Sequence, residues 1–174
     1  FMDYGATILS IFTPDKDNRK ESILMAFDSL EQYIDNDIYL NAIIGPTSGR
    51  IKNAEFKINN QSYQLDKNNQ KQDNLHGGSD TFAFKFFDFE IIEEKNLTKV
   101  IFTYLKPKEN STFPGNVSVK IIYTVKENEL LIEYEAETDE DTLLNLTNHA
   151  YFNLSGNLKN TVLDHELLIK THSS

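Results

Sequence analysis

The sequence predicts an all-β protein, a large antiparallel β-sandwich in which residues 1–174 form a single domain. Three observations favour this fold. Apolar and polar residues alternate with period two along several runs, which is typical of half-buried strands. Short polar segments that contain asparagine or glutamate separate these runs and are suited to hairpin loops. Signals for helices are weak throughout the chain.

The first half of the chain is expected to contain short elements. Residues 3–8 (Asp-Tyr-Gly-Ala-Thr-Ile) predict a strand near the first residue, and the true start of the protein is expected to lie before it. Residues 29–33 predict one short helical turn with Ser29 as its cap. Over residues 56–65, apolar and polar positions alternate on both sides of an Asn-Asn pair. Since asparagine tolerates the left-handed backbone of short turns, this segment predicts a tight hairpin.

Longer strands are expected in the second half. Residues 82–92 contain five phenylalanines and predict a long, well-buried strand that pairs with residues 99–105. Residues 117–125 alternate apolar with mostly polar side chains, and residues 132–136 repeat this pattern with glutamate on the outer face. A further strand is expected from Val162 to Ile169. Hairpin loops are expected at residues 93–96 and 126–129.

The composition excludes several classes of function. The chain has no cysteine, which excludes disulfides, thiolate metal sites and a cysteine nucleophile, and fits the expected cytoplasmic location. Its formal net charge is −10, whereas nucleic-acid binding requires clustered lysine and arginine. No apolar stretch approaches the roughly 20 residues of a membrane span. The sequence contains no phosphate-binding loop, no GxSxG motif and no HExxH motif, and a metal site is not expected.

Two histidines lie in segments with more polar chemistry than strand packing requires. His76 is followed by two glycines in residues 74–78 (Asn-Leu-His-Gly-Gly), where the backbone can adopt positive φ and approach a ligand closely. His149 lies among amides, a hydroxyl and aromatic rings in residues 147–154. Structural roles are also compatible, as a surface-loop histidine for His76 and a hydrogen-bonded core histidine for His149. Together, the segments predict a polar site that binds a small hydroxylated molecule and moves protons on it.

Arg50 and the other histidines give weaker signals. Arg50 follows a loop with two glycines and a proline, residues 45–49, which suits the presentation of a guanidinium to vicinal hydroxyls or a carboxylate. Pairing of Arg50 with a surface acid is equally compatible with the sequence. His165 and His172 have no supporting context and are interpreted as structural.

The segments resemble, in the same order, those of the aldose 1-epimerase family, also called galactose mutarotases. Residues 4–8 resemble the early strand of the family and residues 14–16 its following loop. Residues 45–56 resemble the segment whose usual sequence is Gly-Arg-x-x-Asn-Arg-Ile-x-x-Gly-x-Phe. Residues 74–78 and 145–154 are similar to the two signature stretches of the family, which are specific. The resemblance covers nearly the whole chain.

The resemblance implies a galactose mutarotase-like β-sandwich with a carbohydrate cleft across one face. It implies that His149 is the general acid that protonates the ring oxygen of a pyranose, and that His76 holds the same region by hydrogen bonds. Arg50 matches the second arginine of the family and is implied to contact sugar hydroxyls, and Tyr151 is implied to line the pocket. The implied activity is the interconversion of α and β anomers of aldohexoses, such as galactose and glucose, by acid–base ring opening without a cofactor.

The sequence departs from the family pattern in two respects. Pro46 replaces the first arginine of the family and Gly49 replaces the asparagine before the second, so local sugar contacts are expected to differ. The family domain continues well past the segment that matches residues 145–154, and its general base, a glutamate, has no counterpart here. The chain is therefore expected to be an incomplete, N-terminal part of the sandwich, nearly inactive alone and prone to self-association through exposed sheet edges.

Two other functions are compatible with the sequence. One is a non-catalytic carbohydrate-binding module that has the cleft and lacks the base. The other is an epimerase relative that acts on hexose-6-phosphates, for which Arg50 and Lys52 supply basic side chains near the expected cleft. In each case the expected partner is a small sugar rather than nucleic acid or a membrane.

Overall fold

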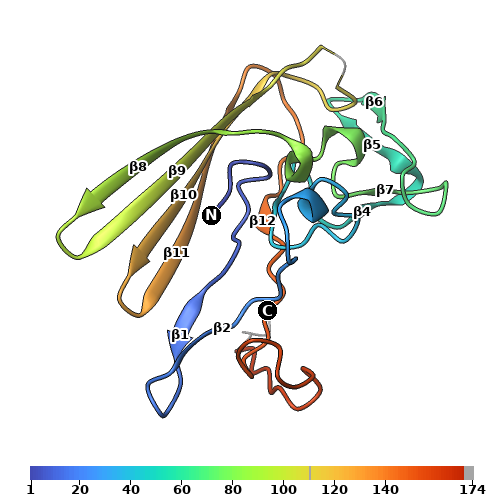
Figure 1. The fold of residues 1–174 in the computed structure, drawn as a ribbon. Coiled ribbons are helices and arrows are strands. Elements are labelled where there is room, and N and C mark those ends of the chain that lie inside the picture. Colours follow the sequence, from blue (N-terminus) through green and yellow to red (C-terminus); the bar gives the residue numbers. More distant parts are fainter. Residues whose placement is uncertain (110, 171–174) are drawn as a thin grey trace.

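The computed structural model describes residues 1–109 and 111–170, which form strands, turns and irregular segments. Its largest element is a four-stranded antiparallel sheet in the order β11-β10-β9-β8. The sheet consists of β8 (Asp88–Glu94), β9 (Leu97–Lys106), β10 (Val117–Lys126) and β11 (Glu129–Thr138). Figure 1 shows this sheet on one side of the molecule, with β4 to β7 on the other. The predicted all-β, antiparallel architecture is confirmed.

The other strands are short and pair in antiparallel two-stranded sheets. They are β1 (Phe12–Pro14) with β2 (Lys20–Ser22), β3 (Ile43–Ile44) with β12 (Thr147–Asn148), β4 (Arg50–Ile51) with β7 (Asn74–Leu75), and β5 (Glu55–Ile58) with β6 (Gln61–Gln64). Short 3₁₀ helices are η1 (Glu31–Tyr33), η2 (Lys52–Ala54), η3 (Gly78–Asp80) and η4 (Phe82–Phe84). Within the described ranges, no helix has the length and apolar character needed to cross a membrane.

The core lies between the inner face of the four-stranded sheet and segments from the first half of the chain. The predicted alternation along β10 is confirmed for its first four inward side chains, which are buried: Val117, Val119, Ile121 and Tyr123. Val125, predicted to face inward as well, is 36% exposed near the end of the strand. Ile122, which interrupts the outer polar row, is only 8% exposed, so the second face of β10 is partly covered as well. The side chains that pack against the inner face include Ala6, Ile8, Leu24, Ile43 and Phe82. Burial of this apolar surface is the main stabilising contribution to the fold.

The predicted hairpins are confirmed. β5 returns as β6 through Asn59 and Asn60, whose φ values of 50° and 64° are left-handed. This conformation at both central residues matches the twist of a two-residue hairpin. β8 and β9 are joined at Lys95-Asn96, and β10 and β11 at Glu127-Asn128. Each turn therefore lies within a predicted loop, residues 93–96 or 126–129, and the outer residues of these loops belong to the strands.

The predicted strand over residues 3–8 is wrong. Gly5 and Ala6 have φ values of 67° and 45°, so the chain turns where an extended conformation was expected. An isolated bridge between Met2 and Thr7 closes this turn. Alternation alone cannot detect such a turn, because Ala6 is buried in it as it would be in a strand.

The prediction of one long, buried strand over residues 82–92 is also wrong. The first part forms η4, in which Phe82 is fully buried, and the strand β8 begins only at Asp88. β8 lies at the edge of the sheet, and its Phe89 and Ile91 are 61% and 55% exposed. An edge strand has a neighbour on one side only, which explains its weak burial. The predicted pairing with residues 99–105 is confirmed.

The predicted helical turn near residues 29–33 is present as η1, but Ser29 does not cap it. The residue before η1 is Leu30, which makes no side-chain capping hydrogen bond. Instead, the Gln32 side-chain oxygen accepts hydrogen bonds from the backbone N–H groups of Asp28 and Ser29 at 2.9 and 3.0 Å. A side chain within the turn thus holds the two backbone N–H groups that precede the cap position.

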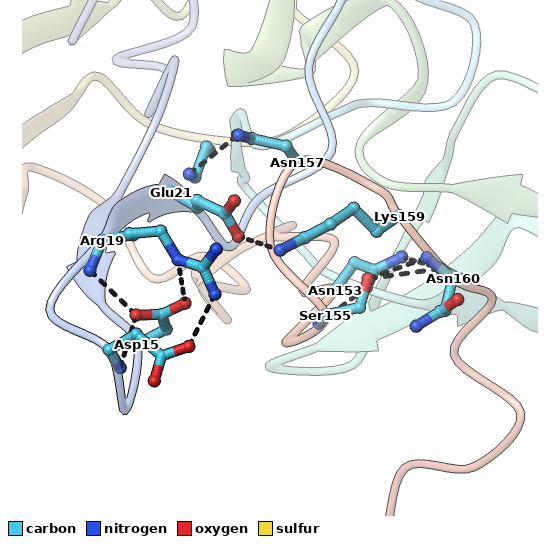
Figure 2. A network of polar contacts seen from close by, with 10 residues as sticks. Asp15, Arg19, Glu21, Asn153, Ser155, Asn157, Lys159 and Asn160 are labelled. Carbon is cyan, nitrogen blue, oxygen red and sulfur yellow. Dashed lines mark hydrogen bonds and ion pairs between the residues drawn. The ribbon is translucent and has the colours of Figure 1, made fainter.

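A polar network fastens residues 153–160 to β2 (Figure 2). Lys159 forms an ion pair with Glu21. The Asn157 side-chain oxygen accepts from Ser22 N at 3.0 Å, and Asn157 N donates to Ser22 O at 2.8 Å. These contacts hold the chain after the histidine segment against the β1–β2 hairpin.

Residues 162–169 do not form the predicted strand. Every residue in this segment is exposed, and Leu163 and Leu167 are each 85% exposed. A strand needs a neighbour for its backbone hydrogen bonds, and none of the strands in the described part of the chain pairs with this segment. His165 Nε2 accepts from Leu154 N at 2.8 Å, in agreement with a structural role. His172 lies outside the described residues.

We expect Phe102→Ala to lower the free energy of unfolding by about 3–5 kcal/mol, because it removes a large core side chain. Phe102 is 2% exposed, whereas Phe12, at 62% exposed, offers a matched control. Phe12→Ala should change the free energy of unfolding by about 0.5 kcal/mol or less. Urea denaturation followed by circular dichroism measures both values. Equal losses in the two variants would contradict this location of the core.

Candidate functional site

Residues 41–51 form the common support of the candidate site. Within this stretch, β3 pairs with β12 and β4 pairs with β7. His149 follows directly after β12, and His76 follows directly after β7. Because one continuous stretch supplies the partner of each strand, it aligns two histidine segments that are far apart in the sequence.

The structure brings the two predicted histidines together. The ring centroids of His76 and His149 are 5.1 Å apart, and the ring planes are nearly perpendicular at 86°. Both side chains are half-buried. The geometry therefore places two imidazoles side by side with part of each surface accessible to solvent, as a shared site for a small molecule requires.

Local hydrogen bonds fix the orientation and the tautomer of His76. Its backbone N–H donates to Gly49 O at 3.0 Å, and its Nδ1 accepts from Gly49 N at 3.1 Å. A nitrogen that accepts a hydrogen bond carries no proton, so the neutral ring holds its proton on Nε2. His76 has a left-handed backbone with φ of 54°, which turns its ring back toward Gly49.

The surroundings of His76 keep its imidazole neutral. Burial is the largest cause, and the neighbouring His149 and Arg50 act in the same direction, so that the pKa of His76 is lowered from 6.5 to about 4. Burial and nearby positive charge both disfavour the protonated ring. Near neutral pH, His76 is therefore a hydrogen-bond donor through Nε2 and not a cation.

The two glycines after His76 are needed for packing within the protein. Gly77 and Gly78 have φ values of 85° and 60°, as expected from the sequence. The sequence predicted a close approach of a ligand to this backbone, but the group that approaches it is part of the protein. A Cβ on Gly77 would lie 2.6 Å from the carbonyl oxygen of Gly45. Gly77 thus allows the His76 turn to pack directly against the loop after β3, and Gly78 allows close packing against the side chains of Asn74 and Asp66.

The backbone of His149 is held through both its N–H group and its carbonyl group. Its N–H donates to Ala42 O at 2.9 Å, and its carbonyl accepts from Asn41 N at 3.0 Å. The ring of Tyr151 lies 5.2 Å from that of His149, and the Tyr151 hydroxyl donates to Ile38 O at 3.1 Å. Tyr151 therefore stands beside the imidazole pair, with its hydroxyl already bonded to the protein.

Arg50 lies at the exposed margin of the site. Its Nε donates to the side-chain oxygen of Asn69 at 3.2 Å. It is close enough to His76 to help lower the pKa of that ring. In the described part of the chain it makes a hydrogen bond to an amide rather than an ion pair with an acid.

Tyr39 belongs to the site without a sequence signal that distinguishes it from a core residue. Its ring lies 4.8 Å from that of His76 and 6.1 Å from that of His149. On its other side it stacks on Phe84, with centroids 5.4 Å apart and planes at 18°. The aromatic ring thus forms a backing for both imidazoles. Only the convergence of distant segments reveals this role.

The proton-transfer groups that this arrangement brings together are two imidazoles. His76 offers a neutral N–H donor, and His149 beside it is a second imidazole that can give or take a proton. Among the described residues, no carboxylate forms an ion pair with either ring. Hollows of about 460, 450 and 380 Å³ open elsewhere on the surface, and these three are not lined by the imidazole pair.

Comparison with known proteins gives one family. The profile described as aldose 1-epimerase matches residues 1–174. Galactose mutarotase of Bos taurus is 32% identical over 170 residues, which cover 97% of this chain and 48% of that protein. Aldose 1-epimerase of Haemophilus influenzae is 39% identical over 155 residues, which cover 88% of this chain and 44% of that protein.

The fold agrees with the same family. The crystal structure of an aldose epimerase homologue from C. elegans superposes with a TM-score of 0.79 at 28% identity. The superposition covers 87% of this chain and 46% of the other. The chain spans about half the length of the curated relatives that it matches.

We expect His149→Ala to raise the pKa of His76 from about 4 toward its ordinary value, because one of the two neighbouring positive charges disappears. Burial and Arg50 remain, so the pKa should stay below the ordinary value of about 6.5. NMR titration of ¹³C,¹⁵N-labelled imidazoles measures the change. His165→Ala is the control and should leave the pKa of His76 where it was. An unchanged pKa in His149→Ala would show that the two rings do not interact.

Proposed function

This chain belongs to the aldose 1-epimerase family, and on this premise we propose that it binds an aldohexose and donates a proton to its ring oxygen. The reaction is the interconversion of the α and β anomers of a sugar such as galactose or glucose. The observation that carries the proposal is the convergence of His76 and His149, with ring centroids 5.1 Å apart.

The proposed reaction begins with proton transfer from His149 to the ring oxygen of the sugar. The bond between C1 and the ring oxygen breaks while the anomeric hydroxyl gives its proton to solvent water or an added base, which leaves an open-chain aldehyde and a new hydroxyl. Rotation about the C1–C2 bond presents the other face of the aldehyde, and the reverse steps close the ring. Imidazole suits the proton transfer because it exchanges protons near neutral pH.

His76 takes a different role from His149 in this proposal. Its low pKa of about 4 keeps it neutral, so its Nε2–H donates a hydrogen bond to the ring-oxygen region. A neutral ring next to the acid also avoids two positive charges within 5.1 Å of each other. The bond from Gly49 N to Nδ1 holds the donor in place.

Arg50 and Tyr151 are proposed to complete the sugar contacts. Asn69 engages only the Nε of Arg50, so the terminal guanidinium nitrogens of this exposed residue are available for sugar hydroxyls. Tyr151 presents its ring rather than its hydroxyl, because the hydroxyl donates to Ile38 O. An aromatic wall of this kind suits the apolar face of a pyranose.

A base for the anomeric hydroxyl is not found next to the imidazoles in the described part of the chain, where neither ring has a carboxylate ion-pair partner. A positioned base contributes roughly 10²–10⁴-fold to the rate, or about 3–5 kcal/mol of barrier. We therefore propose that this chain alone is nearly inactive and that its weak activity depends on His149.

Polarimetry of freshly dissolved α-D-galactose tests the function. We expect a small acceleration over buffer that increases with added formate, because formate substitutes for the missing base. His149→Ala should reduce the rate to that of buffer and formate alone. Equal rates for this variant and the unaltered chain would reject the acid role, and a fast rate without formate would reject the missing base.

Calorimetry with galactose separates the alternatives. Binding without any rate that depends on His149 would favour a carbohydrate-binding module. Tighter binding of galactose-6-phosphate, lost in Arg50→Ala, would favour the hexose-6-phosphate relative. We expect weak binding of galactose and no gain from the phosphate, because Arg50 and Lys52 are the two basic side chains that the sequence places near the expected cleft.

Self-association through the edges of the large sheet is a further part of the proposal. β8 and β11 are its edge strands, and they expose Phe89, Ile91 and Leu131 at 61%, 55% and 42%. An edge with free backbone groups and apolar side chains pairs readily with a second copy. The cytoplasmic location expected from the sequence stays a prediction.

We expect sedimentation velocity to show an average mass that rises with protein concentration. Ile91→Lys places a charge on the β8 edge and should weaken the association at least about tenfold, since edge lysines block pairing. Leu163→Lys is the matched control, because Leu163 is exposed but lies outside the sheet. A monomer at every concentration would contradict the proposal, as would equal weakening by both variants.

A further inference from the structure

Asn41 is an asparagine in an unusual position beside the candidate site. It is 0% exposed and has a left-handed backbone with φ of 56°. Asparagine is one of the few residues other than glycine that adopt this conformation at modest cost. A buried amide must also find partners for its donor and its acceptor, so this position has two separate requirements.

The side chain of Asn41 joins two segments that are far apart in the sequence. Its Nδ2 donates to Met25 O at 2.7 Å, and its Oδ1 accepts from Tyr151 N at 3.0 Å. Met25 N in turn donates to Tyr151 O at 2.9 Å. The amide therefore closes a three-residue ring of hydrogen bonds that fixes the chain two residues after His149.

The backbone of Asn41 holds the other side of the same segment. Its N–H donates to the carbonyl of His149 at 3.0 Å. Its carbonyl accepts from the side-chain Nδ2 of Asn148 at 3.1 Å and from Ile8 N at 3.2 Å. Contacts from this single residue thus reach the positions before, at and after the proposed acid.

The backbone and side-chain contacts of this position favour asparagine. Glycine would accept the backbone conformation but would lose both side-chain hydrogen bonds. Aspartate would retain the acceptor for Tyr151 N but would place a buried carboxylate oxygen against the carbonyl of Met25. The amide of asparagine supplies its donor and its acceptor on two separate atoms, whereas a serine hydroxyl would have to offer both on one oxygen.

We propose that Asn41 is a positioning residue that sets the orientation of His149 toward His76. The effect of Asn41 on the reaction rate rests on the proposed function, whereas its effect on the orientation of the imidazole pair does not. The residue touches neither sugar nor reacting atoms in this proposal and acts through the backbone on both sides of His149.

The test compares Asn41→Gly with Asn18→Gly. Asn18 also has a left-handed backbone, with φ of 62°, and is exposed, so both variants remove an asparagine side chain from the same conformation. In histidine-labelled protein, we expect the nuclear Overhauser effect between the rings of His76 and His149 to fall at least about threefold in Asn41→Gly. It should be unchanged in Asn18→Gly. An unchanged effect in Asn41→Gly would overturn the proposal.

A second measurement does not depend on the folding of a variant. In the unaltered protein, we expect a scalar coupling across the hydrogen bond between the amide nitrogen of Tyr151 and the side-chain carbonyl carbon of Asn41. If this coupling is absent, the proposal fails even if Asn41→Gly is unfolded. If the coupling is present and Asn41→Gly is unfolded, the result supports the hydrogen bond from Tyr151 N to Asn41 as the contact that holds the segment around His149.

Activity provides the link to the proposed function. The formate-dependent rate should fall at least about tenfold in Asn41→Gly and stay unchanged in Asn18→Gly. If the rate of the unaltered chain equals that of His149→Ala, the proposed function fails. The ring-to-ring effect still decides the role of Asn41 in that case.

Discussion

The structure of the site depends on the pairing of one stretch, residues 41–51, with two strands at once. β3 fixes β12 in a register that places Ile43 opposite Asn148, and β4 fixes β7 with Arg50 opposite Leu75. A shift of one residue in either register would turn the following histidine to the opposite face. The two strand pairings therefore bring the histidines together, and the hydrogen bonds at Gly49 and Asn41 then hold each segment in place.

The site is also tied to the large sheet. The Nδ2 of Asn148 donates to the hydroxyl of Tyr123 on β10 at 3.2 Å, and that hydroxyl donates to Ala6 O at 2.8 Å. Tyr123 is fully buried, and burial raises its pKa far above the ordinary range, so the hydroxyl keeps its proton. A rigid core residue thus anchors the segment that carries His149, in agreement with the need for fixed geometry in proton transfer.

The two histidines of the site have the same side chain but different surroundings. His76 receives a hydrogen bond from Gly49 N at Nδ1 and has a pKa of about 4, so it is neutral. The hydrogen bonds found for His149 in the described part of the chain are those of its backbone with Asn41 and Ala42. The different partners of two equal groups suffice to make one a donor of hydrogen bonds and the other the proposed acid.

The sequence by itself determined the features that depend on neighbouring residues. These include the alternation along β10, the left-handed turn at Asn59-Asn60 and the two histidine segments. The tertiary structure decided which segments meet. Residues 162–169 have the pattern of a strand, but no strand of the described ranges pairs with them. Tyr39 and Asn41 gain their roles only through contact with residues 76 and 148–151. Local patterns follow from backbone and side-chain chemistry over a few residues, whereas pairing, burial and convergence depend on partners that no local pattern identifies.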